Sequence, residues 1–367
     1  MAQPVVALRA ANTCTPRRPQ RWALPAAGAV PPGVARRQGF SGLVLHAPAR
    51  ERSYDMALQA FSDQPVPGPP RDYVGYGRHI PKVRWPDNAR VAINLVLNYE
   101  EGSEYTHPAG DKRNDGLTEI PYVMEATYRD LAAESVYEYG SRAGVWRVQR
   151  LIDGYKLPLT CFAAATALER NREVAAWLQE AGHEPCSHGW RWEEVWRLSR
   201  EDEYQHMLWA IESIQATVGQ RPRGWYCRYG PSVHTRELLV EEGGFVYDAD
   251  AYNDDLPYFT TVKGTRHLVV PYSLTHNDAR FVLAQGYSSP TDFAESLKRA
   301  FDTYWEEGAD RPRMMSVGLH PRLIGQAGRI AGLKEFLDYA LAKGDVWFAK
   351  RIDIAHWWLE HHAEFTR

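Results

Sequence analysis

Short apolar runs recur along the chain from about residue 71 onward, and each has the length of a β-strand. The first, at residues 91–98 (VAINLVLN), is almost uninterrupted, which is typical of a strand buried on both faces. Seven further runs are predicted to be strands, at residues 158–164, 184–187, 224–227, 245–249, 268–273, 314–320 and 346–350.

Longer amphipathic stretches lie between these runs and predict helices. They cover residues 134–155, 166–181, 200–218, 235–242, 290–307, 333–342 and 353–361. Glycines such as Gly182, Gly243 and Gly344 follow several of them, as expected of helix C-terminal stops. Strands that alternate with helices predict an α/β fold with a parallel sheet. Seven or eight such units fit a closed or nearly closed barrel, although a doubly wound open sheet also fits the pattern.

Residues 1–65 differ from the rest in composition. Seven arginines precede the first acidic residue, Glu51, among many Ala, Pro and Gly residues. An arginine-rich, acid-poor leader resembles an organelle transit peptide. The Pro31-Pro32 pair and the lack of serine enrichment speak against one, and a start at Met56 is the alternative. We expect a disordered or non-native extension here, a catalytic domain at residues 71–362, and a cytoplasmic protein.

Composition excludes several functional classes. A net charge of -3 provides no field that would attract nucleic acid or an anionic membrane surface. No apolar run is long enough to span a bilayer. The four cysteines form no CxxC pair, which suits free thiols in a reducing compartment. A small-molecule substrate is therefore the expected partner, and most of the 13 Trp and 20 Tyr residues are expected to be packing material.

Polar residues stand at the predicted carboxyl ends of the strands, where parallel barrels carry their catalytic groups. They are Glu100, Glu101, His188, Arg228, Asp248, Asp250 and His320. Each one alone has an ordinary structural interpretation, because polar residues end most strands. Acids, histidines and an arginine that gather at one predicted rim indicate a site.

His188 stands where a zinc ligand would be expected, but a partner is missing. A second histidine four residues later would let both imidazoles reach one ion. The chain has Trp192 at that position. Either Glu193 or Glu194 could supply a ligand instead if the loop folded differently.

The same positions, in the same order, resemble the five motifs of the polysaccharide deacetylase superfamily (the NodB homology domain). The family's Thr-Phe-Asp-Asp-Gly is matched by residues 98–102 (NYEEG), and its Ser/Thr-His-x-x-x-His by residues 187–192 (SHGWRW). An Arg followed by a Pro, supporting aspartates and a Leu-His pair are matched at residues 228–231 (RYGP), 247–250 (YDAD) and 319–320 (LH).

Longer stretches narrow the resemblance, which covers roughly residues 71–360, to the allantoinase branch, known for working without a metal. They are NYEEGSE, ESVYEYGSRAGVWR, SHGWRW, GWY, EEGGFVYDADAYNDDLPY and GLHPRLIG. The resemblance implies a distorted (β/α) barrel of about seven strands and, by analogy with allantoinase-like relatives, a homo-oligomer. Of the family's three metal ligands, only Glu101 and His188 are matched in this chain. We therefore expect no cofactor, with zinc bound by these two residues as the disfavoured alternative.

The resemblance also implies roles in catalysis. Glu100 would be the general base on a water, held by Arg228, and His320, supported by Asp250, would protonate the leaving nitrogen. Other residues are expected to bind the ring or position the water, and these are Glu101 and His188 together with the aromatic residues Tyr99, Trp192 and Trp225.

The expected function is hydrolysis of a non-peptide C–N bond, with a small cyclic amide such as allantoin opened to allantoate without a metal. A strained or activated ring amide needs less assistance than an acetamide, which makes the loss of a metal compatible with such a substrate. The alternatives are a cyclic imide hydrolase, a metal-dependent carbohydrate N-deacetylase and a non-catalytic relative that only binds its ligand.

Overall fold

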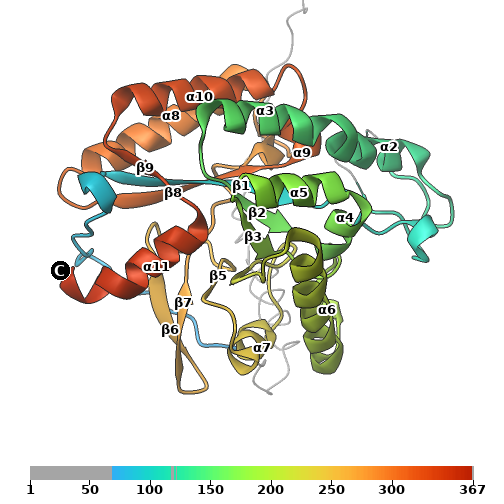
Figure 1. Cartoon of the computed structure of the whole chain (residues 1–367), viewed down its shortest axis with the longest axis horizontal. Helices are drawn as coiled ribbons and strands as arrows, with labels where there is room; N and C mark the ends of the chain where they lie inside the picture. Colours follow the sequence, from blue (N-terminus) through green and yellow to red (C-terminus); the bar gives the residue numbers. More distant parts are fainter. Residues whose placement is uncertain (1–67, 117–119, 121, 366–367) are drawn as a thin grey trace, which may run out of the picture. The chain divides into compact units, whose positions relative to one another are not determined.

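The computed structural model describes residues 68–116, 120 and 122–365 of the chain. The extension expected at residues 1–65 lies outside these residues. From residue 68 onward the chain folds around one curled, largely parallel sheet with helices packed on its outer side (Figure 1). The predicted α/β fold, a distorted barrel of the (β/α) kind, is confirmed.

Crossover connections place the strands in the order β6-β7-β5-β4-β3-β2-β1-β8 across the sheet. Strand β9 also pairs with β1. The strands are β1 (Val91–Tyr99), β2 (Thr160–Ala163), β3 (Glu184–Ser187), β4 (Gly224–Trp225), β5 (Tyr247–Asp248), β6 (Tyr258–Val262), β7 (Thr265–Val269), β8 (Arg313–Leu319) and β9 (Val346–Phe348). All their pairings are parallel except that of β6 with β7.

The β6–β7 hairpin was not predicted from the sequence. Its two strands are joined by Lys263 and Gly264, which both adopt positive φ values, of 46° and 84°. Such two-residue turns match the twist of an antiparallel pair. Only four of the hairpin's ten strand residues are buried, so most of it lacks the continuous apolar run by which the other strands were recognised. The end of β7 overlaps the strand predicted at residues 268–273.

The central strand β1 is buried on both faces, which explains why its sequence is almost entirely apolar. Its odd-numbered positions pack into the core formed with the outer helices, as Leu95 and Leu97 do. Ala92 and Val96 face the barrel interior, where they join a second cluster that includes Phe162. A strand that is buried on both faces cannot show a polar alternation.

A buried arginine organises the lower part of the barrel interior. Arg351, the first residue of α11 (Arg351–His361), is fully buried. Its guanidinium donates to Ser316 Oγ at 2.8 Å, to Asn94 Oδ1 at 3.2 Å and to the Pro271 carbonyl oxygen at 2.7 Å. These bonds connect the start of α11 to three different segments, which compensates part of the cost of burying the charge.

The other helices cover the outside of the sheet and lie close to where the periodicity predicts them, except for a short helix at Pro321–Ile324 that was not predicted. They are α2 (Leu131–Tyr139), α3 (Val145–Tyr155), α4 (Ala165–Arg170), α5 (Arg172–Glu180), α6 (Arg200–Val218), α7 (Thr235–Glu242), α8 (Pro290–Glu307), α9 (Pro321–Ile324) and α10 (Ile330–Lys343). Helices α3, α8 and α10 lie along one side of the sheet (Figure 1). In the part of the chain that the structure describes, no helix is long and apolar enough to cross a membrane.

Two predicted helices are less regular than the periodicity indicates: one contains a π-helical turn, and the other is divided in two. The predicted helix at residues 134–155 contains a π-helical turn at Gly140–Gly144, between α2 and α3. The predicted helix at residues 166–181 breaks at Asn171, whose φ of -128° and ψ of 85° are not helical. Ends of helices α6, α7 and α8 agree with the prediction because caps mark them, such as the Ser289–Asp292 capping box before α8.

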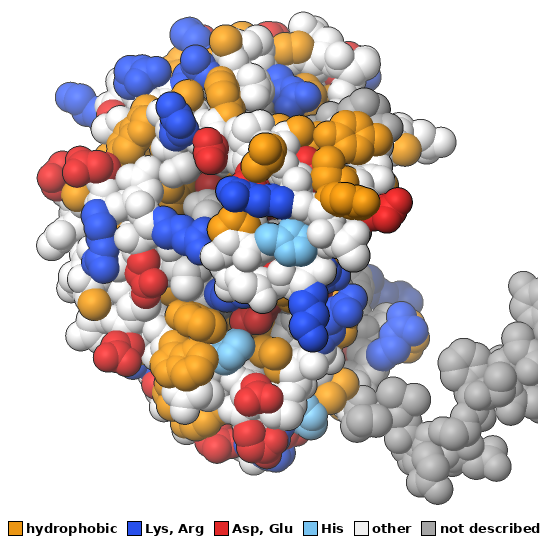
Figure 2. Space-filling view, turned by 90° about the vertical axis from the view of Figure 1, so that its right-hand side faces the viewer, with side chains coloured by type: hydrophobic (Ala, Val, Ile, Leu, Met, Phe, Trp, Pro, Cys, Tyr) orange, Lys and Arg blue, Asp and Glu red, His pale blue; other side chains and the backbone are white. Residues whose placement is uncertain are grey.

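Positive and negative side chains are interspersed on one face of the molecule. Figure 2 shows Lys and Arg side chains beside acidic and hydrophobic ones across this face. The face therefore presents no continuous field of one sign.

A buried histidine makes the stability of the fold depend on pH. His183, between α5 and β3, packs edge-on against Trp177 at a ring-centroid distance of 5.0 Å. Neither of its ring nitrogens has a hydrogen-bond partner among residues 68–116, 120 and 122–365. Burial, joined by the charge of Lys350, lowers the pKa of His183 from 6.5 to about 4.

We predict that a His183→Gln variant loses less stability in acid than the parent. Because the unfolded chain binds a proton on His183 before the folded one does, folding free energy is lost as the pH falls from about 6.5 toward 4. Between about pH 7.5 and about pH 5, the parent should lose about 2 kcal/mol more than the variant in urea unfolding experiments. Equal losses would show that His183 is not held neutral by burial.

Candidate active site

Three residues predicted from the sequence meet at the carboxyl end of the sheet. Ala163 of β2 pairs with both Tyr99 and Ser187, so the next residues on the two flanking strands, Glu100 and His188, leave the sheet at the same level. His320 follows β8. The Nε2 atoms of His188 and His320 lie 3.4 Å and 3.6 Å from Glu100 Oε1, and all three side chains are buried.

The guanidinium that contacts Glu100 is that of Arg322, not of Arg228 as predicted. Arg322 Nη1 lies 2.8 Å from Glu100 Oε2 and 3.8 Å from Glu101 Oε1. The short helix α9 begins directly after His320 with Pro321, and its second residue, Arg322, reaches Glu100 at the end of β1. Sequence reasoning missed Arg322, although it stands two residues after His320 within the quoted stretch GLHPRLIG.

The two adjacent glutamates differ in protonation. Burial alone would raise the pKa of Glu100, but the positive charges of Arg322 and His320 hold it well below its usual range. Burial raises the pKa of Glu101 to about 7. The positive charge of Arg322 opposes this rise only in part, and the negative charge of Glu100 adds to it. At neutral pH Glu100 therefore carries a full negative charge, while Glu101 is about half protonated.

Glu101 connects the end of β1 to the start of α9. Its carboxylate accepts the backbone N–H groups of Glu100 and Arg322, both at 3.1 Å. Gly140, in the π-helical turn, lies so close that a Cβ atom there would overlap the Glu101 carboxylate. Gly144 is similarly close to the Pro321 carbonyl oxygen. Glu101 is therefore a positioning residue for both charged neighbours, and its predicted contact with substrate stays a prediction.

Asp278, not Asp250, supports His320. The His320 Nδ1 atom lies 2.6 Å from Asp278 Oδ1, and Asp278 Oδ2 accepts the backbone N–H groups of His320 and Ile324. Burial would lower the pKa of His320, but the charges of Asp278 and Glu100 raise it to about 10. Asp250 Oδ1 instead accepts the Cys227 N–H. Asp278 begins the 3₁₀ helix η5 (Asp278–Phe281), in a stretch where no strand or helix was predicted, so no pattern in the sequence marked it.

Arg228 holds the segment that follows β1. It forms a two-pronged ion pair with Asp115, at 2.5 and 2.7 Å, and donates to the Trp192 carbonyl oxygen at 2.8 Å. Its guanidinium carbon lies 3.7 Å from the Trp192 ring centroid. Trp192, at the position where a second metal ligand was expected, is therefore a stacking surface for Arg228. The Arg322 guanidinium carbon also lies 5.5 Å from the Trp192 ring centroid.

The loop that carries His188 is joined to the same segment by further contacts. Arg191 forms an ion pair with Asp111 at 2.6 Å, and the Tyr105 hydroxyl donates to Glu194 at 2.8 Å. Glu193 is paired with His206 of α6 at 2.6 Å. Both glutamates that could have replaced a missing metal ligand are therefore engaged elsewhere.

Two of the predicted ring-binding aromatic residues lie in the core instead. Tyr99 is fully buried on the helix-facing side of β1, and its hydroxyl hydrogen-bonds with Ser141 at 2.9 Å. Trp225 packs edge-on against Phe245, and its indole N–H lies 3.1 Å from the Cys227 sulfur. The alternation of strand side chains sends both rings to the side opposite the barrel interior.

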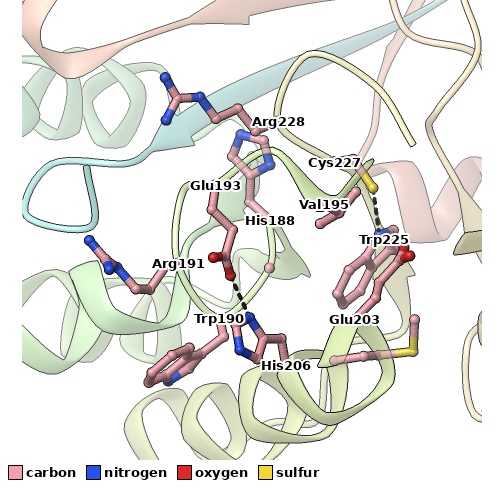
Figure 3. A pocket seen from close by; sticks show the side chains of 12 residues that line it. His188, Trp190, Arg191, Glu193, Val195, Glu203, His206, Trp225, Cys227 and Arg228 are labelled. Carbon is pink, nitrogen blue, oxygen red and sulfur yellow. Dashed lines mark hydrogen bonds and ion pairs between the residues drawn. The ribbon is translucent and has the colours of Figure 1, made fainter. Parts of the chain in front are cut away.

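A small cavity lies behind the His188 loop, against α6 (Figure 3). Its volume of about 10 Å³ is enough for roughly one water molecule, so it cannot hold the substrate. In Figure 3 Glu193 and His206 point toward each other, while Arg191 and Arg228 point away from the cavity.

The residues present do not fit a catalytic zinc site. Arg322 places a fixed positive charge at the two glutamates, where a divalent ion would be repelled. His188 Nδ1 faces the Tyr226 carbonyl oxygen at 2.9 Å, and its other nitrogen faces Glu100. Within the described ranges no three His, Cys, Asp or Glu side chains are grouped so that they could hold a metal ion.

Comparisons with known proteins show to which family the chain is similar. Residues 130–247 match the family model described as polysaccharide deacetylase. A Schizosaccharomyces pombe protein named for that family is 36% identical over 316 residues, which cover 80% of this chain and 98% of the relative.

Two solved structures are similar over most of their length. One, from Pseudomonas aeruginosa PAO1 and also named for polysaccharide deacetylases, has a TM-score of 0.77 and 46% identity over 80% of this chain and 99% of its own. The other, the Puue allantoinase, has a TM-score of 0.77 and 45% identity over 80% and 98%. The similarity to the second supports the resemblance to the allantoinase branch. The chain belongs to the polysaccharide deacetylase family of hydrolases that act on C–N bonds.

Proposed function

We propose that this protein opens a small cyclic amide, with allantoin as the leading candidate, by hydrolysis that needs no metal ion. The observation that carries the proposal is the Arg322 guanidinium at Glu100 and Glu101, a permanent positive charge in the position where a metal would otherwise be needed. The 45% identity to a structure named as an allantoinase supports the choice of substrate.

The catalytic residues of the proposed reaction are Glu100 and His320. Glu100 takes a proton from a water molecule, and the resulting hydroxide attacks the ring carbonyl carbon. Charged His320 gives its proton to the ring nitrogen as the C–N bond breaks. Glu100 Oε1 and His320 Nε2 lie 3.6 Å apart. The proton that Glu100 takes from water can therefore pass to His320, which restores both groups.

Arg322 and Asp278 prepare these two residues. Arg322 keeps Glu100 ionised and adds positive charge where the tetrahedral intermediate becomes negative. Asp278 keeps His320 charged and fixes its ring, so that Nε2 is the nitrogen that gives the proton.

A second candidate function is removal of an N-acetyl group from a carbohydrate. The names of the Schizosaccharomyces pombe and Pseudomonas aeruginosa relatives favour it. An unactivated acetamide depends more on a metal for polarisation of its carbonyl group, and the described residues do not fit one. A cyclic imide hydrolase would use the same residues as the proposed reaction.

Chelation tests the proposed function directly. We expect protein dialysed against EDTA and shown to be metal-free by mass spectrometry to hydrolyse allantoin at the rate of the untreated protein. Loss of activity that zinc restores would contradict the proposal and favour the metal-dependent N-deacetylase. A parallel assay with N-acetylglucosamine oligomers distinguishes that alternative.

Replacement of the proposed base should remove activity and leave the fold intact. Glu100→Gln keeps the size of the side chain but cannot accept the proton of water, so kcat should fall by about 10²- to 10⁴-fold. Glu212→Gln, on the exposed face of α6, is the matched control and should keep the parent rate. A Glu100→Gln variant with near-parent kcat would exclude Glu100 as the base.

The pH dependence of kcat/KM should identify the partner of His320. The charged form of His320 is the active one. The value of kcat/KM should therefore be highest below the His320 pKa of about 10 and should fall as the pH rises through that value. Asp278→Asn removes the negative charge that raises this pKa, so the alkaline fall should move to lower pH. Asp250→Asn should leave it in place, and a shift in that variant instead would restore the pairing predicted from the sequence.

A further inference from the structure

Tyr137 of α2 lies against the active site without any role in the reaction proposed above. Its side chain is 2% exposed. Its ring packs edge-on against Trp192 at a centroid distance of 6.3 Å, and the Arg322 guanidinium carbon lies 5.1 Å from its centroid. The Tyr137 ring is therefore fixed between Trp192, which stacks on Arg228, and Arg322, which contacts Glu100.

The hydroxyl group of Tyr137 is buried and has no hydrogen-bond partner among the residues described by the structure. A phenol that loses its hydrogen bonds to water and gains none in the fold destabilises the folded state. Buried polar groups nearly always have a partner, so an exception in a candidate active site points to a ligand that completes it.

Other buried tyrosines near the site are satisfied, which makes Tyr137 distinct. The Tyr226 hydroxyl bonds with that of Tyr252 at 2.8 Å, and the Tyr272 hydroxyl accepts from Asn98 at 3.1 Å. Tyr99 bonds with Ser141. The fold therefore supplies partners for phenols in this region generally, and the lack of one is specific to Tyr137.

The charges around Tyr137 favour an oxygen acceptor. Arg228 and Arg322 both act on its hydroxyl electrostatically, and Arg228 Nε is a second buried donor without a partner among the described residues. The carboxylates of Asp115 and Glu100, also near, are already paired with these two arginines. Burial raises the pKa of Tyr137 well above its usual value, so it remains a donor throughout the working pH range.

We propose that the Tyr137 hydroxyl donates a hydrogen bond to a carbonyl oxygen of the bound cyclic amide, and so selects substrates that present an acceptor at that point. This inference rests on the proposed function. It makes Tyr137 a specificity-determining residue. A substrate oxygen drawn toward the two arginines would reach the hydroxyl as well, and the fold leaves that donor free for it.

Comparison of Tyr137→Phe with Tyr247→Phe tests the inference. The Tyr247 hydroxyl donates to Glu184 at 2.7 Å inside the barrel, away from the site. With allantoin as substrate, Tyr137→Phe should lower kcat/KM by about tenfold, mainly through KM, with its thermal midpoint unchanged or raised. Tyr247→Phe should keep kcat/KM but lose a few degrees of thermal midpoint, because it leaves a buried carboxylate short of a donor.

Other results would overturn the inference in recognisable ways. If the parent hydrolyses allantoin and Tyr137→Phe has the same kcat/KM, the hydroxyl does not contact the substrate, and the proposed function stands alone. If Tyr137→Phe is destabilised like Tyr247→Phe without a change in kcat/KM, its partner is structural. If the parent hydrolyses neither allantoin, hydantoin nor succinimide, the proposed function is wrong and this inference falls with it.

Discussion

The ion pair between Arg322 and Glu100 is the interaction on which the rest of the site depends. Two adjacent glutamates are buried at the end of β1, where an unpaired carboxylate would take up a proton. The guanidinium keeps Glu100 ionised, while burial and the charge of Glu100 leave Glu101 partly protonated near neutral pH. Because both partners are buried, loss of the Arg322 guanidinium would leave the Glu100 carboxylate without its main compensating charge, at a cost of about 3–5 kcal/mol.

The surrounding structure serves to hold this pair in place. Glu101 fixes the backbone on both sides of it, and Gly140 and Gly144 let the π-helical turn approach Glu101 and Pro321. A side chain at either glycine would push the turn away from the site. Arg228 contributes indirectly. It does not contact Glu100 but fixes the segment that follows β1 through its ion pair with Asp115.

The fold was largely predictable because burial leaves a direct record in sequence. The uninterrupted apolar run of β1 and the capped helices α6, α7 and α8 were identified with nearly correct ends. The β6–β7 hairpin was missed because most of its residues are only partly buried or exposed and its two strands are joined by a two-residue turn. The π-helical turn at residues 140–144 and the break at Asn171 were missed because the apolar period continues across them.

The sequence by itself determined the α/β class, the resemblance to a known family, and the placement of Glu100, His188 and His320 at one rim. These follow from strand order and from the rule that parallel strands end at the same edge. The tertiary structure alone decided the partners: Arg322 for Glu100, Asp278 for His320 and Asp115 for Arg228. Such pairs join residues 42 to 222 positions apart. Which side chains meet across such separations depends on how loops cross the rim, and neither periodicity nor strand spacing encodes that path.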